Sequence, residues 1–309
     1  MRALVSPELV NGVFGDPVLY LDFRDEKRAL LFDVGDVSRL PPKRILRVSD
    51  VFVSHAHMDH FAGLDRMVRV LLGRGALLRL YGPPGFLERV EHKLSAYTWN
   101  LAERYPGDFA LLAHELAPDG NLRIARFASR SNFARQPLPE TRVPEGVLLD
   151  EPRFRVRGAF LDHGIPCLGF ALEEKAQVNV WKNRLAQMGL ETGPWLAELK
   201  ARALDIAPGQ KICYITDIRY HAENEARAAR LAADADLFFI ESVFLSPQAD
   251  HAARKFHLTA AQAGRIARAA RAKTVIPFHF SPRYEGRGAE LVAELEASRS
   301  AAEGDPAWN

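Results

Sequence analysis

The sequence predicts an α/β protein. Short apolar runs typical of strands recur along the chain and alternate with segments whose apolar residues return at helical spacing. With 309 residues, of which 48% are hydrophobic, the chain can form one large domain with a substantial core, or two smaller ones. Side chains of metal-binding type follow several of the apolar runs, as expected where strands end at one edge of a sheet.

The elements of the first third follow from this alternation. Residues 18–21 and 29–32 are apolar runs separated by five charged residues, which predicts a two-stranded hairpin. Residues 51–53 predict a buried strand, and residues 61–72 show helical spacing. A strand at 77–81 ends at a Gly-Pro-Pro-Gly turn, and a helix at 86–101 follows.

The remainder contains several more strands and three helical segments. Residues 110–157 predict several strands, of which 154–157 alternates apolar and basic residues and is therefore half exposed. Residues 178–188 and 195–204 predict amphipathic helices around Gly193-Pro194, so that 174–209 is expected to be a helical insertion. Later come strands at 211–215, 237–240 and 274–278, with Thr259 as N-cap of a helix to about Ala272.

Composition excludes several classes of protein. The net charge is +2 with His neutral, so any contact with nucleic acid must come from a local patch. Two cysteines, Cys167 and Cys213, are too few for a disulfide framework and indicate a reduced, cytoplasmic protein. The N-terminus does not have the pattern of a signal peptide. No apolar stretch approaches the ~20 residues of a membrane span.

The most informative segment runs from Ser54 to His60. It contains His55, His57, Asp59 and His60 directly after the predicted strand at 51–53. Residues two apart on an extended strand point the same way, so His55 and His57 can share one metal while Asp59 and His60 face another. Imidazole and carboxylate together suit zinc and its neighbours. The alternative is a polar turn with scattered histidines, which ten His in the whole chain make improbable.

Further ligands are offered by three later strand ends, at His163, Asp217 and His279. A single His after an apolar strand is more often a hydrogen-bonded core residue than a ligand. Functional groups of α/β sheets nevertheless gather at strand ends, so the three together support a site that needs more than four ligands.

The complete set resembles that of the metallo-β-lactamase fold. The resemblance implies a single αββα domain, in which two mixed β-sheets pack face to face between helices. It also implies two divalent metals, with Zn²⁺ expected and Mn²⁺ or Fe²⁺ as alternatives. One metal would take His55, His57 and His163; the other would take Asp59, His60 and His279, with Asp59 also counted as catalytic. Asp217 would bridge them, and Asp33 would orient a ligand His or form a turn.

Within this fold, three segments resemble ribonuclease Z, which trims the 3′ end of precursor tRNA. They are Phe239-Ile240-Glu241-Ser242, the run from His257 to Ala263, and the run from Pro277 to Tyr284. The resemblance implies a homodimer and makes His257 the acid at the departing oxygen, held by Glu241. The alternatives are a helix cap for His257 and a salt-bridge partner for Glu241. Ser281 and Arg283 could hold phosphate oxygens, although a structural role for Arg283 is nearly as common.

The sequence thus predicts a dinuclear-metal phosphodiesterase acting on RNA, with no membrane partner. The alternative is a hydrolase of small phosphodiesters, such as cyclic nucleotides, or of other esters on the same fold. Departures from the family pattern keep it open: Met58 stands in place of a glycine and Leu64-Asp65-Arg66-Met67 in place of a Pro-Gly-Leu-Leu-like run. The glycine-rich N-terminal segment and a Gly-Thr-Gln-like turn at 36–44 are missing, and the segment that resembles the tRNA-binding arm is shorter than expected. Eight arginines between Arg123 and Arg157 could form an RNA-facing patch or an ordinary solvated face.

Overall fold

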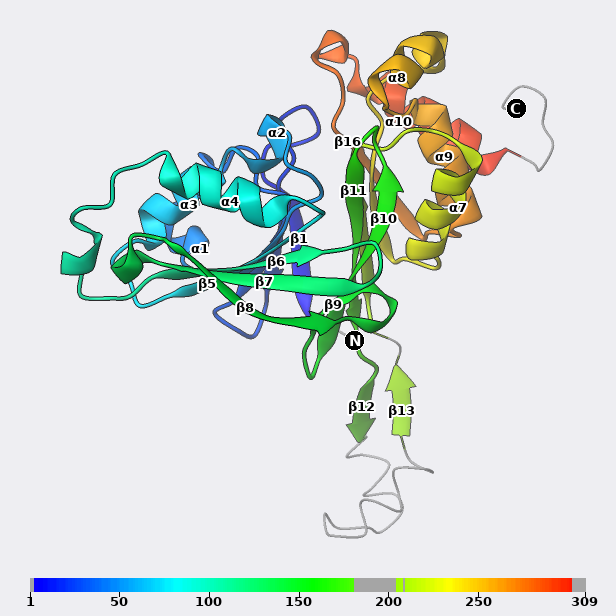
Figure 1. The fold of residues 1–309 in the computed structure, drawn as a ribbon. Helices are drawn as coiled ribbons and strands as arrows, with labels where there is room; N and C mark the ends of the chain where they lie inside the picture. The colour runs from blue at the N-terminus through cyan, green and yellow to red at the C-terminus, as the bar shows by residue number, and fades with distance from the viewer. Residues whose placement is uncertain (1–2, 181–203, 208, 302–309) are drawn as a thin grey trace, which may run out of the picture.

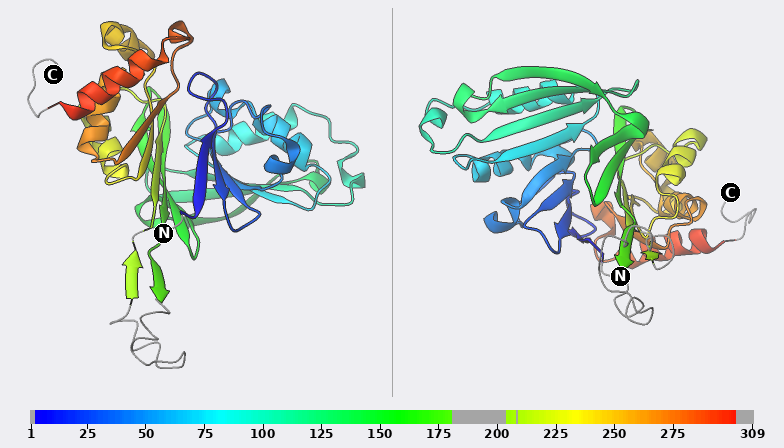
Figure 2. Two further views of the ribbon diagram at one scale, coloured as in Figure 1. Left: turned by 180° about the vertical axis from the view of Figure 1, so that it is seen from behind. Right: turned by 90° about the horizontal axis from the view of Figure 1, so that it is seen from below.

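Two β-sheets pack face to face, and helices cover the outer face of each. This arrangement is seen in a computed structural model, in which residues 3–180, 204–207 and 209–301 are described. Helices of the N-terminal half lie outside the first sheet and helices of the C-terminal half lie outside the second (Figures 1 and 2). The layers therefore run α, β, β, α, as the sequence predicts.

The first sheet has eight strands in chain order, β1 to β8. Its centre is parallel, because β3 pairs with β4, β4 with β5 and β5 with β6 in the same direction, while the outer strands are antiparallel. The strands are β1 Val5–Leu9, β2 Leu19–Phe23, β3 Ala29–Phe32, β4 Val48–Phe52, β5 Leu77–Gly82, β6 Ala110–Leu116, β7 Asn121–Ala128 and β8 Arg135–Arg142.

The second sheet has six strands in the order β16-β15-β14-β11-β10-β9. Here β14, β15 and β16 are parallel, and β9, β10 and β11 are antiparallel neighbours. The strands are β9 Val147–Asp150, β10 Phe154–Asp162, β11 Pro166–Glu174, β14 Lys211–Ile215, β15 Leu237–Glu241 and β16 Thr274–Phe278. Strands β12 Gln177–Val180 and β13 Leu204–Ala207 form a separate antiparallel pair that extends away from the body (Figure 1).

Helices pack on both outer faces. The helices over the first sheet are α1 Pro42–Ile45, α2 Met58–Phe61, α3 Leu64–Leu71 and α4 Phe86–Ser95. Those over the second are α7 Ala222–Leu231, α8 Ala249–Lys255, α9 Ala260–Ala269 and α10 Gly288–Ser300. Short 3₁₀ turns occur at Ala102–Arg104, Ser129–Ser131, Pro144–Gly146, Ser246–Gln248 and Pro282–Tyr284.

The alternation of side chains along each strand places some apolar residues between the two sheets and others beneath the helices. On β3, Leu30 and Phe32 point into the layer between the sheets, whereas Ala29 and Leu31 point toward the helices. Because both faces of the strand are covered, its run is continuously apolar rather than alternating. Aromatic side chains dominate the inter-sheet layer; the Phe32 ring lies 5.4 Å from that of Phe170 on the facing sheet. This layer fixes the relative position of the strands that carry the functional residues.

Most predicted elements are confirmed, including the hairpin of β2 and β3 and the strands β4, β5, β14, β15 and β16. Helix α9 begins after Thr259, whose hydroxyl accepts from the Gln262 N–H while the Gln262 side chain accepts from the Thr259 N–H. Strand β1 was not predicted, because its polar and proline-containing run lacks an apolar signal. Among the described residues, the structure contains no helix long and apolar enough to cross a membrane.

Three helix predictions are wrong in part. Residues 178–180 and Leu204, predicted as helical, belong to the paired strands β12 and β13, so the described ends of the expected insertion are extended. The remainder of the two predicted helices lies outside the described residues. Helix α4 ends at Ser95 rather than at residue 101. The indole N–H of Trp99 donates to the Leu94 carbonyl and helps to satisfy the end of the helix.

Candidate metal centre

The C-terminal ends of the parallel strands of both sheets meet at one edge of the sandwich. Strand β4 leads into the segment from Ser54 to His60, and β14 is followed closely by Asp217. Glu241 is the last residue of β15, and His279 follows β16. His163 directly follows β10 and lies at the same edge. All seven residues proposed as metal ligands therefore reach the same edge from distant parts of the chain.

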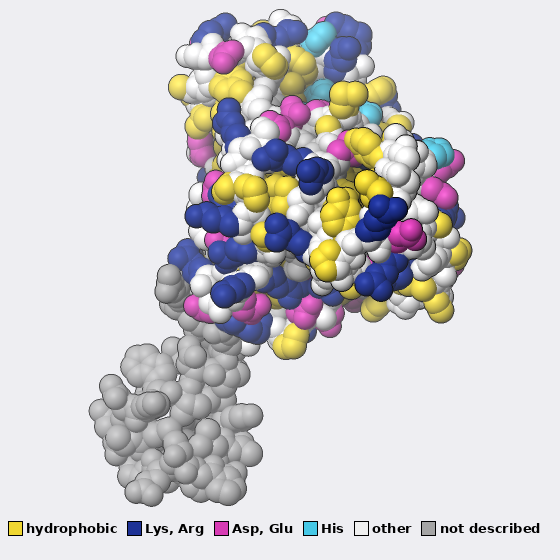
Figure 3. Space-filling model, turned by 90° about the vertical axis from the view of Figure 1, so that its left-hand side faces the viewer, with side chains coloured by type: hydrophobic (Ala, Val, Ile, Leu, Met, Phe, Trp, Pro, Cys, Tyr) yellow, Lys and Arg dark blue, Asp and Glu magenta, His cyan; other side chains and the backbone are white. Residues whose placement is uncertain are grey.

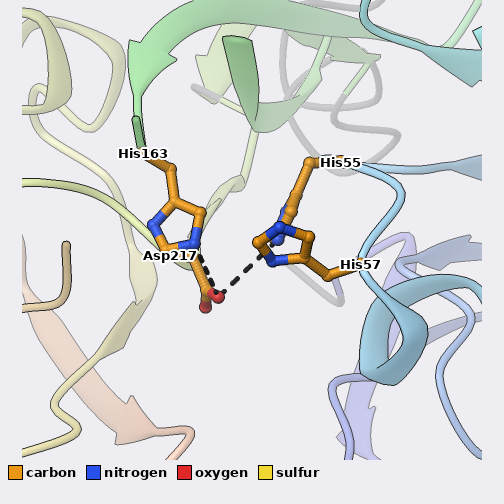
Figure 4. A group of neighbouring side chains, drawn as sticks. All are labelled: His55, His57, His163 and Asp217. Carbon is orange, nitrogen blue, oxygen red and sulfur yellow. Dashed lines mark ion pairs between the residues drawn. The ribbon is translucent and has the colours of Figure 1, made fainter. Parts of the chain in front are cut away.

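The first group of side chains consists of His55, His57, His163 and Asp217. One ligand atom from each lies within 4.8 Å of the others. The Oδ2 atom of Asp217 lies 3.7 Å from the Nε2 atom of His55 and 3.5 Å from that of His163 (Figure 4). The His57 ring packs 4.3 Å from the His55 ring and 5.3 Å from the His163 ring, centroid to centroid. Three imidazoles and one carboxylate thus converge, and His57 is the one exposed to solvent.

A second group lies beside the first and consists of Asp59, His60 and His279, again within 4.8 Å. The Oδ2 atom of Asp59 lies 3.4 Å from the Nε2 atoms of both His60 and His279. Asp217 also contacts this group, with its Oδ2 3.4 Å from His60 Nε2 and its Oδ1 2.8 Å from His279 Nδ1. The carboxylate of Asp217 therefore stands between the two groups, which is the position that the family resemblance implies for a bridging ligand.

Unpaired buried nitrogens show that the two groups fit a metal. The Nε2 atoms of His55 and His60 are buried without a hydrogen-bond partner. An unpaired buried polar atom costs about 1–3 kcal/mol, so two in one cluster need an explanation. Imidazole nitrogens and carboxylate oxygens are ligands of divalent zinc and of similar ions. The donor set therefore suits a pair of divalent cations.

The protonation states of the histidines also indicate that the two groups fit a metal. Burial, and then the neighbouring His60, lowers the pKa of His55 to about 2, so its ring is neutral as a metal ligand must be. Burial also lowers the pKa of His279, but the Asp217 carboxylate outweighs it and raises the pKa to about 10. Without a metal, a histidine proton thus balances the carboxylates. A divalent cation would supply that positive charge instead.

Hydrogen bonds hold several of the rings in place. The Nδ1 atom of His163 lies 2.8 Å from the carbonyl oxygen of Phe256, to which it can donate. The Nδ1 atom of His60 lies 2.9 Å from Asp33 Oδ2. In both cases the bond leaves Nε2 turned toward the cluster, which is the usual arrangement around a metal-binding histidine. The structure therefore places Asp33 where an orienting carboxylate is expected.

His257 and Glu241 form a pair at the edge of the cluster. His257 Nδ1 lies 3.0 Å from Glu241 Oε2 and 4.0 Å from Asp217 Oδ1. Glu241 is fully buried, and its other oxygen accepts a hydrogen bond of 2.7 Å from the Ile218 N–H. Burial lowers the pKa of His257, but Glu241 outweighs it, so the pKa is raised. The His257 side chain is 18% exposed and lies just before Thr259 at the start of α9.

The two residues predicted to bind phosphate belong to neither group. Arg283 is exposed; its guanidinium stacks 5.2 Å from the centre of the Phe244 ring and donates to Gln248. The Ser281 N–H donates to the Val243 carbonyl. Their roles in substrate binding stay predictions.

Sequence reasoning missed three contributors to the site. Ser54 donates from its N–H and hydroxyl to Asp33 and lies 3.0 Å from His55 Nδ1. Tyr214 reaches Asp33 from the opposite sheet. Cys167, which is buried and free, lies 3.8 Å from His55 Nδ1. Ser54 precedes the histidine motif directly, so its place in the sequence was a usable signal. The other two contacts join residues more than 100 positions apart.

The arginines between 123 and 157 are mostly ion-paired. Arg123 pairs with Glu115, Arg126 with Asp108, Arg135 with Glu91, Arg153 with Glu26, Arg155 with Glu173, and Arg157 with Glu145 and Glu173. On the face drawn in Figure 3, Lys and Arg side chains are scattered among acidic and hydrophobic ones. Surface pairs of this kind contribute little energy, and their pairing favours a solvated face over one continuous basic patch.

Comparisons with known proteins agree with this geometry. The model of the β-lactamase superfamily domain matches residues 16–175 and 197–280. A ribonuclease Z of Deinococcus radiodurans is 32% identical over 303 residues, covering 90% of each chain. A ribonuclease Z of Lactobacillus helveticus is 28% identical and covers 85% of this chain and 80% of its own.

Solved structures show the same fold. The short form of human tRNase Z superposes with a TM-score of 0.60 at 21% identity, covering 90% of this chain and 93% of its own. The metallo-β-lactamase fold protein YhfI from Bacillus subtilis gives 0.59 at 17% identity, covering 96% and 95%. The motif at the end of β4, the two groups joined at Asp217 and the extent of these matches lead to one conclusion: the chain belongs to the β-lactamase superfamily and, within it, to the ribonuclease Z family.

Proposed function

We propose that this protein is a metal-dependent phosphodiesterase that cleaves RNA, with the 3′ end of precursor tRNA as its substrate. The observation that carries the proposal is the placement of Asp217 between two groups of ligand-type side chains, with the His257–Glu241 pair at their edge. Hydrolysis of a phosphodiester needs an activated water, stabilisation of charge on phosphorus, and a proton for the departing oxygen. The two groups and the pair together offer all three.

Each side chain has a distinct task. His55, His57 and His163 would hold one divalent ion, and Asp59, His60 and His279 would hold the other, with Asp217 shared. Bound in this way, the ions supply Lewis acidity for the phosphate and an activated water near neutral pH.

His257 would give its proton to the departing oxygen of the RNA. Its Nδ1 is held by Glu241 at 3.0 Å, which leaves Nε2 free for the substrate. Glu241, itself anchored by the Ile218 N–H, keeps the ring in one orientation. His257 is a positioned acid rather than a structural cap, because Thr259 already caps α9 with its own hydroxyl.

The relatives favour RNA over a small phosphodiester. The curated relatives named above are ribonuclease Z enzymes, and they match this chain over most of their length. A small-molecule phosphodiesterase, the alternative considered from the sequence, has no comparable support. Processing of the 3′ end also agrees with the motifs around Glu241, His257 and His279, all of which lie at the site.

Incubation with a precursor tRNA that carries a 3′ trailer tests the proposal. Cleavage at the trailer junction that stops with a chelator and returns with zinc is expected. Asp217→Ala should abolish cleavage, whereas Asp250→Ala, which changes an exposed carboxylate on α8, should leave it intact. Hydrolysis of a cyclic nucleotide in the absence of any RNA cleavage would overturn the choice of substrate.

Metal identity and assembly are further parts of the proposal. Zinc fits a set rich in imidazole, and Mn²⁺ or Fe²⁺ would suit a set richer in oxygen or with open positions. We propose a homodimer as the functional state in the cytoplasm. Elemental analysis of protein purified without chelator and analytical ultracentrifugation measure these two properties.

A further inference from the structure

A fully buried tyrosine connects the second sheet to the first directly beneath the metal centre. Tyr214 lies on β14, and its hydroxyl donates a hydrogen bond of 2.8 Å to Asp33 Oδ2, at the end of β3. Its ring packs 5.8 Å from Phe32 and 5.1 Å from Phe278, in the layer between the sheets. A hydroxyl in so apolar a layer needs a partner, and the partner is a carboxylate next to the ligands.

Asp33 contacts one ligand, His60, directly and a second, His55, through Ser54. Its Oδ1 accepts from the Ser54 N–H at 2.7 Å, and its Oδ2 accepts from the Ser54 hydroxyl at 2.9 Å. The same Oδ2 lies 2.9 Å from His60 Nδ1, and Ser54 Oγ lies 3.0 Å from His55 Nδ1. Asp33 is fully buried, and its backbone has a φ of 57°, a left-handed conformation that costs energy outside glycine. The hydrogen bonds to its carboxylate thus accompany a strained backbone conformation at Asp33.

This network determines which nitrogen of each histidine carries the proton. The Ser54 hydroxyl has one hydrogen and gives it to Asp33, so its oxygen accepts from Nδ1–H of His55. Asp33 likewise accepts from Nδ1–H of His60. In the neutral rings Nε2 is then left with its lone pair directed to the cluster, where neither Nε2 atom has a hydrogen-bond partner. The Asp33 carboxylate therefore orients one histidine in each of the two groups, His60 directly and His55 through Ser54.

We propose that Tyr214 is a positioning residue of the metal centre: from the second sheet its hydroxyl fixes the Asp33 carboxylate, which in turn orients His60 directly and His55 through Ser54. Tyr214 contacts neither substrate nor metal in this scheme. Its effect is to couple the two metal-binding groups, so that loss of one hydroxyl weakens metal binding in both. The inference rests on the proposed metal-dependent function and adds a residue that determines how firmly the metals are held.

Metal binding by Tyr214→Phe tests the inference, because only the hydroxyl is removed. Tyr81→Phe is the matched control, since Tyr81 is a second buried tyrosine of the inter-sheet layer, stacked 4.5 Å from Phe52. The readout is titration of metal-free protein with Co²⁺, in competition with a chromophoric chelator and followed by the visible spectrum of the bound ion. Both stepwise affinities should fall in Tyr214→Phe, by ~10–100-fold, the scale for losing an orienting partner of a ligand. Tyr81→Phe should bind as the unaltered protein does.

Two further measurements separate positioning from loss of folding. Circular dichroism of the metal-free proteins shows whether Tyr214→Phe is folded, and turnover of the variant should return at saturating metal. If the variant does not fold, Ser54→Ala tests the same network, and its Co²⁺ affinity should fall while Ser54→Thr, which keeps the hydroxyl, retains it. Unchanged affinity in folded Tyr214→Phe, unchanged affinity in Ser54→Ala where Tyr214→Phe does not fold, or an equal loss in Tyr81→Phe would overturn the inference. Absence of metal binding by the unaltered protein would overturn the proposed function instead.

Discussion

Replacing His257 with alanine should slow cleavage of RNA without releasing the metals. His257 belongs to neither group of three histidine and carboxylate ligands assigned to one ion each, and its Nδ1 is occupied by Glu241 at 3.0 Å. The alkoxide that departs from RNA must be protonated, and removal of a general acid costs ~10²–10⁴-fold in rate. Because each factor of ten corresponds to about 1.4 kcal/mol of barrier, the expected loss is about 3–5 kcal/mol.

A pair of substrates distinguishes this role from phosphate positioning. The p-nitrophenolate that departs from bis(p-nitrophenyl) phosphate needs no proton, so His257→Ala should affect that reaction much less than cleavage of precursor tRNA. His251→Ala is a suitable control, since its ring packs 5.1 Å from the same Phe244 ring that His257 approaches at 6.3 Å. Single-turnover rates and metal content should be measured for both variants.

An equal loss on the two substrates would assign His257 to phosphate binding and refute its role as acid. Wild-type rates on both would refute any part for it in the reaction. Loss of bound metal from His257→Ala would show that His257 is a ligand, a role that the present assignment does not give it although its ring lies within 4.8 Å of possible ligand atoms of Asp217 and His279.

Three other changes have defined outcomes. Asp217→Ala should reduce both metal content and turnover more than Asp59→Ala, since Asp217 contacts both groups; equal metal content by elemental analysis would contradict the bridge. Glu241→Gln keeps an acceptor for the Ile218 N–H but removes the charge beside His257. RNA cleavage, measured as kcat at saturating substrate, should therefore slow by less than in His257→Ala. A loss larger than that of His257→Ala would contradict the assignment of Glu241 as the residue that only orients His257. Phe170→Ala should lower the free energy of unfolding by ~3–5 kcal/mol, because the side chain is fully buried between the sheets; a change below about 1 kcal/mol in denaturant titrations would contradict its place in the core.

The sequence predicts those parts of the fold that depend on local pattern. The apolar runs of β3 and β4 stand out because both faces of each strand are covered, and Thr259 and Gln262 reveal the start of α9 through a local capping box. The paired strands β12 and β13 were predicted as helical at their described ends, since amphipathic spacing in a short segment does not distinguish the two structures. Tertiary pairing decides between them.

The candidate site, like the fold, could be predicted from the sequence only in part. The ligand set was predicted because histidines are rare in this chain and follow apolar strands together with aspartates, a pattern that resembles the family's. The parallel strands then bring these side chains together. The link from Tyr214 to Asp33 joins residues 181 positions apart. A tyrosine within an apolar strand reads simply as a core residue, because nothing in the local sequence tells where its hydroxyl points. Contacts across the two sheets therefore needed the structure.

Anomalous X-ray scattering from crystals grown with zinc tests the central claim most directly. Two zinc peaks are expected, one among His55, His57 and His163 and the other among Asp59, His60 and His279, with Asp217 in contact with both. Elemental analysis of the same protein should give two zinc ions per chain. A single peak, a peak away from these residues, or protein that stays free of zinc after reconstitution would contradict the dinuclear centre on which the proposed function depends.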